Sequence, residues 1–470
     1  MIIDLLTQDY RSKSIDNNQS ELINMYLEED TNKGKYKLVA YPTFGLVSFC
    51  DTTQANVRAL YEFLDVLYCV AGNKFYSINS AGTKTELGTL NTSSGFAKIA
   101  AISGGGTSNQ LVIIDGTNGY HYNVTTATAT FPIVDVDFPQ TADDITNQDD
   151  YIIIKKASSI AFAISNLADG LSYDALDFGS KIRFPDRLAA ICSRNAELWL
   201  LGTRTTQPFF NSGNADFPFE QIPSTLIEYG CAAKRSVVVS ENTLYCLAKN
   251  ANGGNIIVKY NGYAPQKIST RAIDYQISQL TSVSDCIAYA YSLEGHEFID
   301  FTFPTDLATM TYDTTTGGWL QRKSYNGSAY SRFLGSCHAS CYNKSLIGAY
   351  NSGVIYQQSS TTYTENGTAI QRRFVSPILY SEGKRIFIDG LRIDVENNIG
   401  SSKTFDLEKS HDNGRTWTTV GTYTIPTSGA GRINIQKLGS ERSWMFRITS
   451  TTNGKFVLLG FQATGEIGAN

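Results

Sequence analysis

The sequence predicts an all-β protein, a β-propeller of six or seven blades followed by a C-terminal β-sandwich. Composition is the first observation: only 18% of the 470 residues are charged, whereas 27 are Tyr, 24 are Phe and 39 are Gly. Such a mixture, with few long helical patterns, favours strands and turns. The second observation is a strand-like apolar core that recurs along the chain. The third is a change to short alternating segments after about residue 366.

Residues 1–42 differ in character from the rest of the chain and are expected to form an N-terminal arm. The stretch ELINMYLEEDTNKGKYKLVAYPTFGL has a charged middle and then the extended run KLVAYPTFGL. We expect the arm to lie across the main domain or a neighbouring chain and to lead into a first strand. The first residues turn polar after one short apolar run, so no secretory signal is predicted. No apolar run approaches membrane-spanning length.

Residues 43–365 are predicted to form the propeller. Most of the recurring cores follow a turn and precede a second strand, as in SENT, LYCLA and NIIVKYNGY. A sandwich of many strands would also alternate, but it would not repeat core, turn and partner strand at the blade period of roughly 40 to 60 residues. The cores are LYCVAG from Leu67, LVIIDG from Leu111, IAFAIS from Ile160, LWLLG from Leu198, LYCLA from Leu244, IAYAYS from Ile287 and SLIGAY from Ser345.

Residues 366–470 are predicted to form the sandwich. Segments such as KRIFIDGLRIDVEN and SWMFRITST alternate apolar and polar residues over short strands. About a hundred residues is the usual size of that architecture.

Charge and cysteine content limit the classes of function. The formal net charge is −5 and no long basic run occurs, which argues against dedicated nucleic-acid binding. A wall along which DNA merely slides is compatible with this charge. The eight Cys residues, several within expected strands, are interpreted as buried free thiols in a chain made in a reducing compartment.

One complete Asp box, S-x-D-x-G-x-T-W, occurs in the predicted sandwich. The Asp carboxylate can accept backbone N–H groups across the turn, Gly supplies an unusual φ, and Trp packs underneath. Several copies occur in sialidases and other glycan-active propellers, where they lie away from the active site. We interpret this copy as a structural turn formed by Ser410, Asp412, Gly414, Thr416 and Trp417.

Other chemical motifs are interpreted as structural. Cys337, His338 and Cys341 have a spacing that a metal could use, but no fourth ligand is evident nearby. His296 is expected at a solvated hairpin turn. The pairs Asp143–Asp144 and Asp149–Asp150 could be proposed as glycosidase carboxylates, although solvated turn residues are the expected reading. The sequence therefore predicts no catalytic residues, no cofactor and no metal, and hence a protein that is not an enzyme.

Three stretches resemble the tail hub family of short-tailed bacteriophages, also called packaged-DNA-stabilisation proteins. They are INMYLEED with GKYKLVAYPTFGL, then FFNSGNADFPFEQIPSTLIEYGCAAKRSV with NGYAPQKIST, and SHDNGRTW with KLGSERSWMFRITS. They cover nearly the full length in the family's order, and the middle stretch is the most specific.

The resemblance implies a virion tail protein that assembles in the host cytoplasm as a six-fold hub or nozzle. Such a homohexamer lies below the portal and its head-to-tail adaptor, helps to retain packaged DNA, and carries tail fibres or tailspikes. Double-stranded DNA leaves through the channel without sequence-specific binding, so a neutral or weakly repulsive lining is expected.

The loop from Gln207 to Gly230 is the expected assembly surface, because it is aromatic and carries few charges. Its alternative role is a long connection that packs on its own propeller. The Phe residues in question are Phe209, Phe210, Phe217 and Phe219. For the whole protein, the alternative function is a glycan-active or glycan-binding propeller of the sialidase type.

Overall fold

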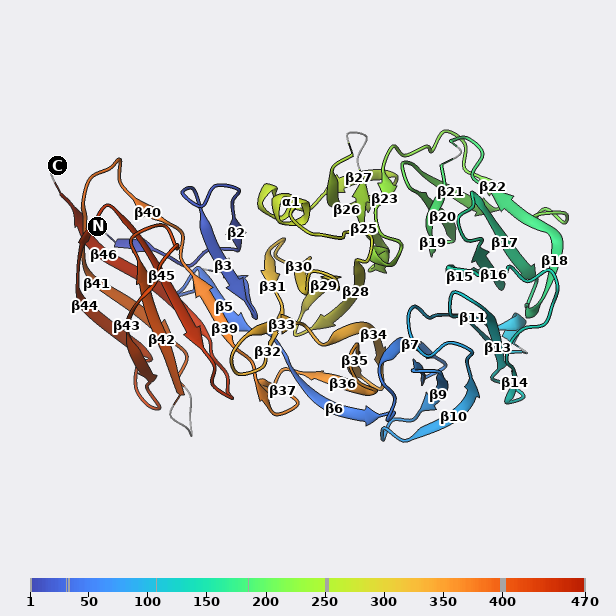
Figure 1. The fold of residues 1–470 in the computed structure, drawn as a ribbon, viewed down its shortest axis with the longest axis horizontal. Coiled ribbons are helices and arrows are strands. Elements are labelled where there is room, and N and C mark those ends of the chain that lie inside the picture. The colour runs from blue at the N-terminus through green and yellow to red at the C-terminus, as the bar shows by residue number, and fades with distance from the viewer. Residues whose placement is uncertain are drawn as a thin grey trace.

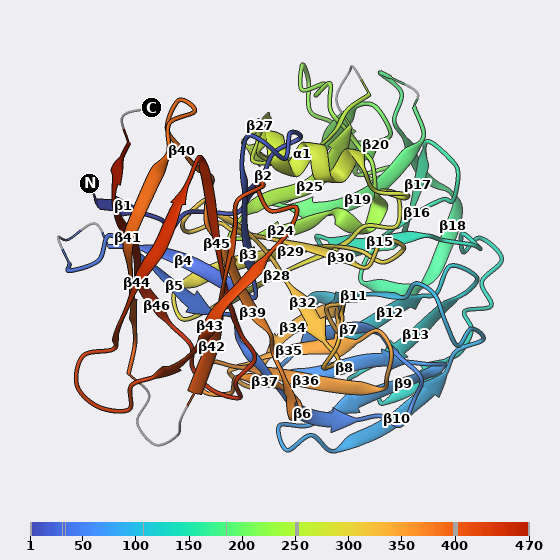
Figure 2. The same ribbon diagram turned by 60° about the vertical axis from the view of Figure 1, so that its left-hand side comes forward.

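The chain folds almost entirely into strands, in a computed structural model that describes residues 2–30, 32, 34–106, 108–184, 186–249, 253–397 and 403–468. Figures 1 and 2 show a ring of small sheets on one side and longer sheets that carry both termini on the other. Over these described residues the only α-helix is α1 (Arg271–Ser278).

Groups of four antiparallel strands surround a common axis, which is the arrangement of a β-propeller (Figure 1). In the part of the chain that is described there are seven such groups, and the first strand of a group lies toward the axis. In the fifth group two short strands share this first position, because both pair with the same second strand. The first four groups are β7 (Val57–Phe63), β8 (Val66–Ala71), β9 (Lys74–Ile78) and β10 (Lys84–Thr89); β11 (Lys98–Ile102), β12 (Gln110–Ile114), β13 (Gly119–Asn123) and β14 (Thr128–Thr130); β15 (Asp144–Gln148), β16 (Tyr151–Lys155), β17 (Ala161–Asn166) and β18 (Asp169–Ser180); β19 (Leu188–Arg194), β20 (Glu197–Gly202), β21 (Thr206–Asn211) and β22 (Phe219–Gln221).

The seventh and last group includes a strand from elsewhere in the chain. The seventh group takes its outer strand from the N-terminal side: β6 (Gly45–Asp51) pairs with β36, so that Gln357 lies opposite Val47. This pairing closes the ring, because β34 also packs against β7 of the first group. The last three groups are β23 (Gly230–Cys231), β24 (Val238–Ser240), β25 (Thr243–Lys249), β26 (Asn255–Asn261) and β27 (Ala264–Lys267); β28 (Ile287–Leu293), β29 (His296–Phe303), β30 (Ala308–Asp313) and β31 (Trp319–Gln321); β34 (Gly335–Cys341), β35 (Lys344–Ala349), β36 (Val354–Ser359) and β6. A short hairpin, β32 (Lys323–Tyr325) and β33 (Tyr330–Arg332), joins the last two groups.

A tight turn recurs between the first and second strands of the groups. Two consecutive residues with positive φ, as in Asn195 (51°) and Ala196 (58°), link strands that pair directly. This is the geometry of a type I′ turn, whose twist matches that of the flanking strands. The same pair of positive φ values occurs at Leu64–Asp65, Asp149–Asp150, Glu241–Asn242, Glu294–Gly295 and Tyr342–Asn343.

Strands from both ends of the chain build two further sheets beside the propeller (Figure 2). One has the order β4-β5-β46-β41-β44, with β1 paired to β46. The other runs β3-β39-β45-β42-β43 and continues into the sixth propeller group, because β3 pairs in parallel with β31. The strands are β1 (Ile2–Asp4), β2 (Tyr10–Arg11), β3 (Gln19–Ile23), β4 (Met25–Glu29), β5 (Leu38–Pro42), β39 (Arg372–Val375), β40 (Leu379–Tyr380), β41 (Ile386–Val395), β42 (Lys403–Ser410), β43 (Thr418–Ile425), β44 (Arg432–Glu441), β45 (Ser443–Ser450) and β46 (Leu458–Ile467). Two short strands, β37 (Thr364–Glu365) and β38 (Thr368–Ala369), instead extend the seventh propeller group beyond β6.

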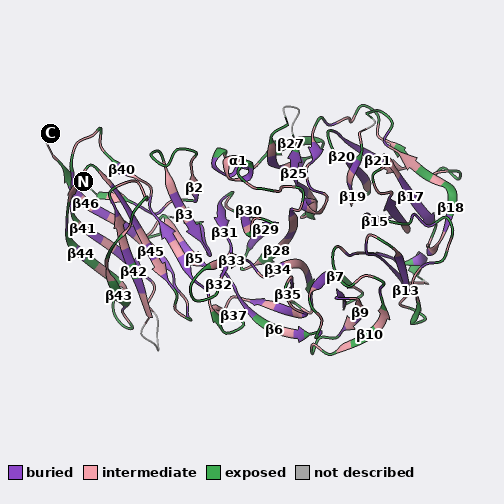
Figure 3. Cartoon of the chain, viewed as in Figure 1, coloured by how far each residue is buried: buried purple, intermediate pink, exposed green. Residues whose placement is uncertain are grey.

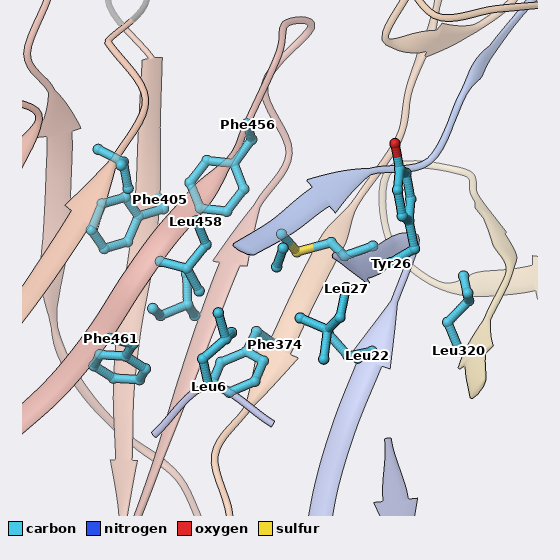
Figure 4. Close-up of a cluster of buried hydrophobic side chains, with 14 of the residues drawn as sticks. Leu6, Leu22, Tyr26, Leu27, Leu320, Phe374, Phe405, Phe456, Leu458 and Phe461 are labelled. Carbon is cyan, nitrogen blue, oxygen red and sulfur yellow. The ribbon is translucent and has the colours of Figure 1, made fainter. Parts of the chain in front are cut away.

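One hydrophobic cluster joins the N-terminal strands, the last propeller groups and the C-terminal sheets. In Figure 4, Leu6, Leu22 and Leu27 lie close to Phe374 and Leu458. Leu320 of β31 belongs to the same cluster. The residues expected to form an arm are therefore part of two sheets and of the core between them.

A buried carboxylate, Asp9, fixes the N-terminal segment against β3. Only 4% of Asp9 is exposed, and its Oδ2 accepts hydrogen bonds from the Leu22 N–H (3.1 Å) and from Nε2 of Gln321 (3.0 Å). Its Oδ1 has no hydrogen-bond partner among the described residues. Burial raises the pKa of Asp9 from 3.8 to about 6.

Asp9→Asn is expected to remove a pH dependence of stability. Between pH 3.8 and 6 the folded protein holds a proton that the unfolded chain releases. Stability from this group is therefore present at low pH and is lost as the pH rises, by about 3 kcal/mol in total. Urea unfolding at pH 4, 5, 6 and 7 measures the free energy of unfolding of both proteins. As the pH rises, this free energy should fall by about 3 kcal/mol more in the wild type than in the variant. Identical pH profiles for the two proteins would contradict this assignment.

Candidate functional site: the axial cavity

A cavity of about 710 Å³ lies between the innermost strands of the propeller. Its walls come from β7, β11, β28 and β34, from the start of β15, and from the 3₁₀ helix Lys234–Ser236. The exposed residues Ser284 and Thr305 also line it, so the cavity reaches solvent beside them. Its charged lining residues are Arg58, Lys98, Asp143, Asp144, Lys234, Arg235, Asp285 and Arg332.

Arg58 is fully engaged by the protein itself. Its guanidinium donates to the carbonyl oxygens of Gly72 (3.0 Å) and Phe96 (2.9 Å), and to both the carbonyl (2.8 Å) and the Oγ1 (2.9 Å) of Thr92. A fifth hydrogen bond reaches the carbonyl of Gly95 (3.2 Å). Burial lowers the pKa of Arg58. With its donors occupied in this way, Arg58 ties the first propeller group to the loop before β11.

Two lysines of the cavity are neutralised by Asp143 and Asp144. Lys98 Nζ lies 2.5 Å from Asp144 Oδ1, and Lys234 Nζ lies 3.1 Å from Asp143 Oδ2. Asp144 also accepts the Ile191 N–H (2.8 Å), and Asp143 also pairs with the buried Lys155. The expectation that these carboxylates are solvated turn residues is wrong for Asp144, which is buried because it holds β11, β15 and β19 together. Asp143 is only partly exposed.

The other two guanidinium groups of the cavity also lack a carboxylate partner and make at most one hydrogen bond within the described chain. Arg235 has no hydrogen bond or ion pair within the described chain and lies over the Phe96 ring, 4.8 Å from its centroid. Arg332, only 6% exposed, lies 4.1 Å from the centroid of the Tyr350 ring. It makes one long hydrogen bond to the Gly335 carbonyl (3.5 Å), and its Nε has no partner in the described part of the chain. Burial lowers the pKa of both arginines.

One carboxylate, Asp285, keeps an oxygen free in the same cavity. Its Oδ2 accepts the Thr305 N–H (2.8 Å), whereas its buried Oδ1 has no hydrogen-bond partner among the residues described. Asp285 lines the same cavity as Arg235 and Arg332, and its charge opposes the lowering of the pKa of both arginines. The cavity is thus lined by two arginines without a carboxylate ion pair and by one aspartate that accepts a single hydrogen bond.

Sequence reasoning missed the unpaired residues of this cavity. Arg235 and Arg332 occur in unremarkable segments, KRSVV and AYSRFL, and their proximity depends on the closure of the ring. The available signal was the position of the Asp143–Asp144 pair directly before an apolar strand pair, which was interpreted as a turn.

The Asp box forms a turn between β42 and β43. The Asp412 carboxylate accepts the Thr416 N–H (2.8 Å) and its hydroxyl (2.6 Å), and these bonds hold the pKa of Asp412 well below its usual range. Ser410 Oγ donates to Asp412 (2.7 Å), Gly414 has a φ of 87°, and Trp417 Nε1 donates to the Gly414 carbonyl (3.1 Å).

The same turn contacts the N-terminal segment. Asn413 Nδ2 and Arg415 Nη1 donate to Asp16 Oδ1, at 2.8 Å and 2.7 Å. These two residues lie between the positions of the sequence motif, and through them the turn is joined to a distant part of the chain.

The segment Gln207–Gly230 is only partly a loop. Phe209 and Phe210 belong to β21 and Phe219 to β22, the outer strands of one propeller group. Phe209 and Phe219 are buried around Phe162, while Phe217 packs on the same cluster and Phe210 is half-buried. Within one chain, these rings therefore pack largely on their own propeller.

An exposed apolar patch lies beside these rings. Leu176 and Phe178 occupy the free edge strand β18, and Leu176 is 80% exposed. Figure 3 shows exposed residues along β18 at the outer edge of the ring. Phe217 lies next to Gly179 of the same strand, which connects the patch to the aromatic segment. We call the following residues the β18 patch: Val134, Val136, Leu176, Phe178, Ile182 and Phe184.

The remaining candidate ligands lie in strands. Cys337, His338 and Cys341 belong to β34, where alternate side chains point to opposite faces, so His338 faces away from the two thiols. His338 Nε2 lies 2.9 Å from Ser345 Oγ, and burial lowers its pKa to about 4. Within the described ranges no group of three metal-ligating side chains was found. The eight Cys residues are free thiols.

The expectation that His296 is solvated is wrong. His296 begins β29, is buried, and stacks near Tyr26 and Phe298. Its Nδ1 lies 2.8 Å from Asp313 Oδ2, and this hydrogen bond raises the pKa of the imidazole. Strand β4 of the N-terminal segment covers the position, which a local hairpin pattern does not reveal.

No helix in the described ranges has the length and apolar character needed to cross a lipid bilayer.

The solved structures that match this chain do so with low TM-scores and low sequence identity. The N-terminal domain of Nup159 matches with a TM-score of 0.38 and 10% identity, covering 72% of this chain and 99% of that one. The extracellular domain of the putative one-component system BT4673 from B. thetaiotaomicron gives 0.43 and 10%, with 88% and 62% covered. YCF48 bound to D1 peptide gives 0.40 and 11%, with 68% and 98% covered. Curated proteins gave no match.

A family model gives a far more specific relationship. The model described as bacteriophage P22 Gp10, β-propeller, matches residues 1–363, which include the N-terminal strands and every propeller group. The match covers well over half of the 470 residues. The chain therefore belongs to the phage stabilisation family of bacteriophage P22 Gp10, a family of phage structural proteins.

Proposed function

We propose that this protein is a tail hub of a short-tailed bacteriophage, assembled as a ring below the portal and its adaptor. The family match over residues 1–363 is the observation that carries this proposal. In this role the ring retains packaged DNA, holds tail fibres or tailspikes, and conducts the genome during ejection. Its assembly takes place in the host cytoplasm and its final location is the virion tail.

The proposed architecture is a seven-bladed propeller joined to a β-sandwich. The seven groups of four strands in the described chain support the blade count. The two sheets that contain β41, β44 and β46 on one side and β42, β43 and β45 on the other share one buried cluster, which supports the sandwich. Strands β1 to β5 complete these sheets, so the sandwich would contain residues from both ends of the chain.

A ring of identical chains needs a surface that only a neighbouring copy covers, and we assign this surface to the β18 patch. Strand β18 spans 12 residues and has no strand partner on its outer side within the described chain. Free edges of this kind pair or pack with other chains unless they are protected. Val136 is 92% exposed, and such clustered apolar exposure is typical of interaction surfaces. The buried Phe209 and Phe219 would support the surface from beneath.

The double substitution Leu176→Ser with Phe178→Ser is expected to give a folded protein that no longer forms rings. Exposed side chains contribute little to the stability of a single chain, so the free energy of unfolding should change by only about 0.5 kcal/mol per residue. Loss of apolar side chains from one side of each contact should weaken a subunit contact at least tenfold. Mass photometry and negative-stain electron microscopy would measure ring size and symmetry for the wild type and the variant.

Leu307→Ser is the matched control, because Leu307 is 55% exposed and lies outside the patch. It should leave the rings intact. Six-fold rings of unchanged stability in the double variant would remove the β18 patch from the interface but would leave the tail-hub assignment standing. A wild-type protein that stays monomeric and is absent from purified phage tails would contradict the tail hub itself.

A further inference from the structure

We propose that the axial cavity is a binding site for a small molecule that carries a phosphate monoester group. The proposal concerns a pocket inside one chain and is independent of ring assembly. At about 710 Å³ the cavity has the size of small-molecule sites, which typically measure about 300 to 1,000 Å³.

The charges of the cavity leave a cationic remainder on one side. Five Lys and Arg residues and three Asp residues line it. Lys98 and Lys234 are paired with Asp144 and Asp143, and Arg58 donates to four residues of its own chain. The remaining charged groups are Arg235, Arg332 and Asp285. In a protein with a net charge of −5, two unpaired guanidinium groups in a cavity indicate an anionic ligand.

Both remaining arginines line the cavity and lie over aromatic rings. Arg235 lies on Phe96 and Arg332 on Tyr350, and stacking on a ring occupies the face of a guanidinium but not its edge. Arg332 is more than nine-tenths buried, yet its Nε lacks a partner in the described chain. The Arg332 guanidinium makes only one long hydrogen bond within the described chain, and an oxyanion in the cavity would give it charge-assisted hydrogen bonds.

Asp285 restricts which anions can bind in the cavity. Asp285 lines the same cavity as the two arginines, and its Oδ2 accepts only the Thr305 N–H among the described residues. A carboxylate here would repel a fully deprotonated anion such as sulfate. It would instead accept a hydrogen bond from a P–OH group or from a hydroxyl next to the phosphate. The combination of two arginines and one such acceptor therefore favours phosphate over sulfate.

Isothermal titration calorimetry at pH 7 and constant ionic strength tests the proposal with four probes: inorganic phosphate, sulfate, glycerol 3-phosphate and glycerol. We expect one saturable site per chain for phosphate and for glycerol 3-phosphate, with sulfate at least tenfold weaker and glycerol without binding. Tighter binding of glycerol 3-phosphate than of phosphate would identify an organic monoester as the ligand. Equal or tighter binding of inorganic phosphate would restrict the site to the free ion and overturn the monoester proposal.

Three substitutions locate the site. Arg235→Gln should weaken phosphate binding at least tenfold and leave the fold intact, because the side chain makes no hydrogen bond within the described chain. Arg332→Gln should have the same effect on binding. Asp285→Asn should bring the affinities for sulfate and phosphate within about threefold of each other, since it removes the repulsion and the selective acceptor.

Arg271→Gln is the matched control, because Arg271 is exposed on α1, outside the cavity. It should bind like the wild type. Absence of saturable phosphate binding to the wild type, or unchanged affinity in Arg235→Gln, would overturn the proposal. Because Arg235→Gln does not alter the β18 patch, it should leave ring formation unchanged, which separates this test from that of the tail hub.

Discussion

Deletion of residues 2–42 is expected to leave the chain unable to fold. This segment supplies β1, β3, β4 and β5, which complete both of the large sheets. Fully burying an apolar side chain stabilises a protein by about 1.5–3 kcal/mol, so the buried side chains of this segment contribute roughly 10–20 kcal/mol. That exceeds the whole stability of a typical domain, about 5–15 kcal/mol. The side chains are Leu5, Leu6, Leu22, Ile23, Met25, Tyr26 and Leu27.

The deletion would also expose partners at the centre of the molecule. Phe374 and Leu458 belong to the same buried cluster as Leu6, Leu22 and Leu27, with Leu6 beside Phe374 in Figure 4, and both would lose packing partners. Near-ultraviolet circular dichroism and thermal unfolding of the soluble fraction would report the loss of fixed packing. Co-expression of residues 1–43 as a separate chain should restore folded protein, because the segment would re-enter the sheets.

A shorter deletion provides the control. Removal of residues 2–4 takes away only the edge strand β1, whose Ile2 is 69% exposed, and should leave a folded chain. If the protein without residues 2–42 unfolds within a few degrees of the wild type, the segment is an accessory arm and not a part of the core.

The N-terminal strands show where sequence reasoning reaches its limit. The extended run KLVAYPTFGL was correctly interpreted as strand-forming, and it contains β5 and the start of β6. Its partners, β4 before it and β46 at the far end of the chain, are set by long-range pairing. Local composition carries no information on that pairing, so the segment was interpreted as an arm.

The propeller repeat could be recognised in the sequence because most groups have a similar apolar second strand that follows a similar turn. LYCVAG, LVIIDG, LWLLG, LYCLA and SLIGAY are second strands, and most of them follow turns with two positive φ values. Two cores were assigned out of phase: IAFAIS is the third strand β17, and IAYAYS is the first strand β28. Strands buried on both faces between neighbouring groups are all apolar, so composition alone does not give their order within a group.

The sequence likewise predicts local parts of the candidate sites but not the parts that depend on long-range folding. The Asp box was predictable because five residues within one turn satisfy one another. The axial cavity was not, because Arg235, Asp285 and Arg332 come from three separate parts of the chain that meet only when the ring closes. The aromatic segment was recognised, but its burial on Phe162 depends on the neighbouring strands β17 and β18.

Arg322→Leu is expected to lower the free energy of unfolding by about 3–5 kcal/mol, because it leaves a buried negative charge without its positively charged partner. Arg322 is 1% exposed and lies over the Phe333 ring, 3.8 Å from its centroid. Its Nη1 donates to Tyr291 Oη (2.8 Å) and lies 3.7 Å from Asp300 Oδ2. Asp300 is fully buried, and burial already raises its pKa although Arg322 opposes the shift.

The double variant Arg322→Leu with Asp300→Asn separates lost charge compensation from lost packing. Asp300 accepts hydrogen bonds from the hydroxyls of Tyr289 (2.9 Å) and Thr311 (2.6 Å), and an amide oxygen can keep one of them. Replacing the carboxylate removes the uncompensated charge, so the double variant should recover about 2 kcal/mol relative to Arg322→Leu alone. Urea unfolding at pH 7 of the wild type, both single variants and the double variant gives the coupling between the two sites.

Arg271→Leu, at an exposed position, should change stability by only about 0.5 kcal/mol. If the losses of unfolding free energy at Arg322 and Asp300 are strictly additive, packing around Phe333 makes this position sensitive, and the buried charge pair does not. Only the charge pair predicts that the second substitution restores stability.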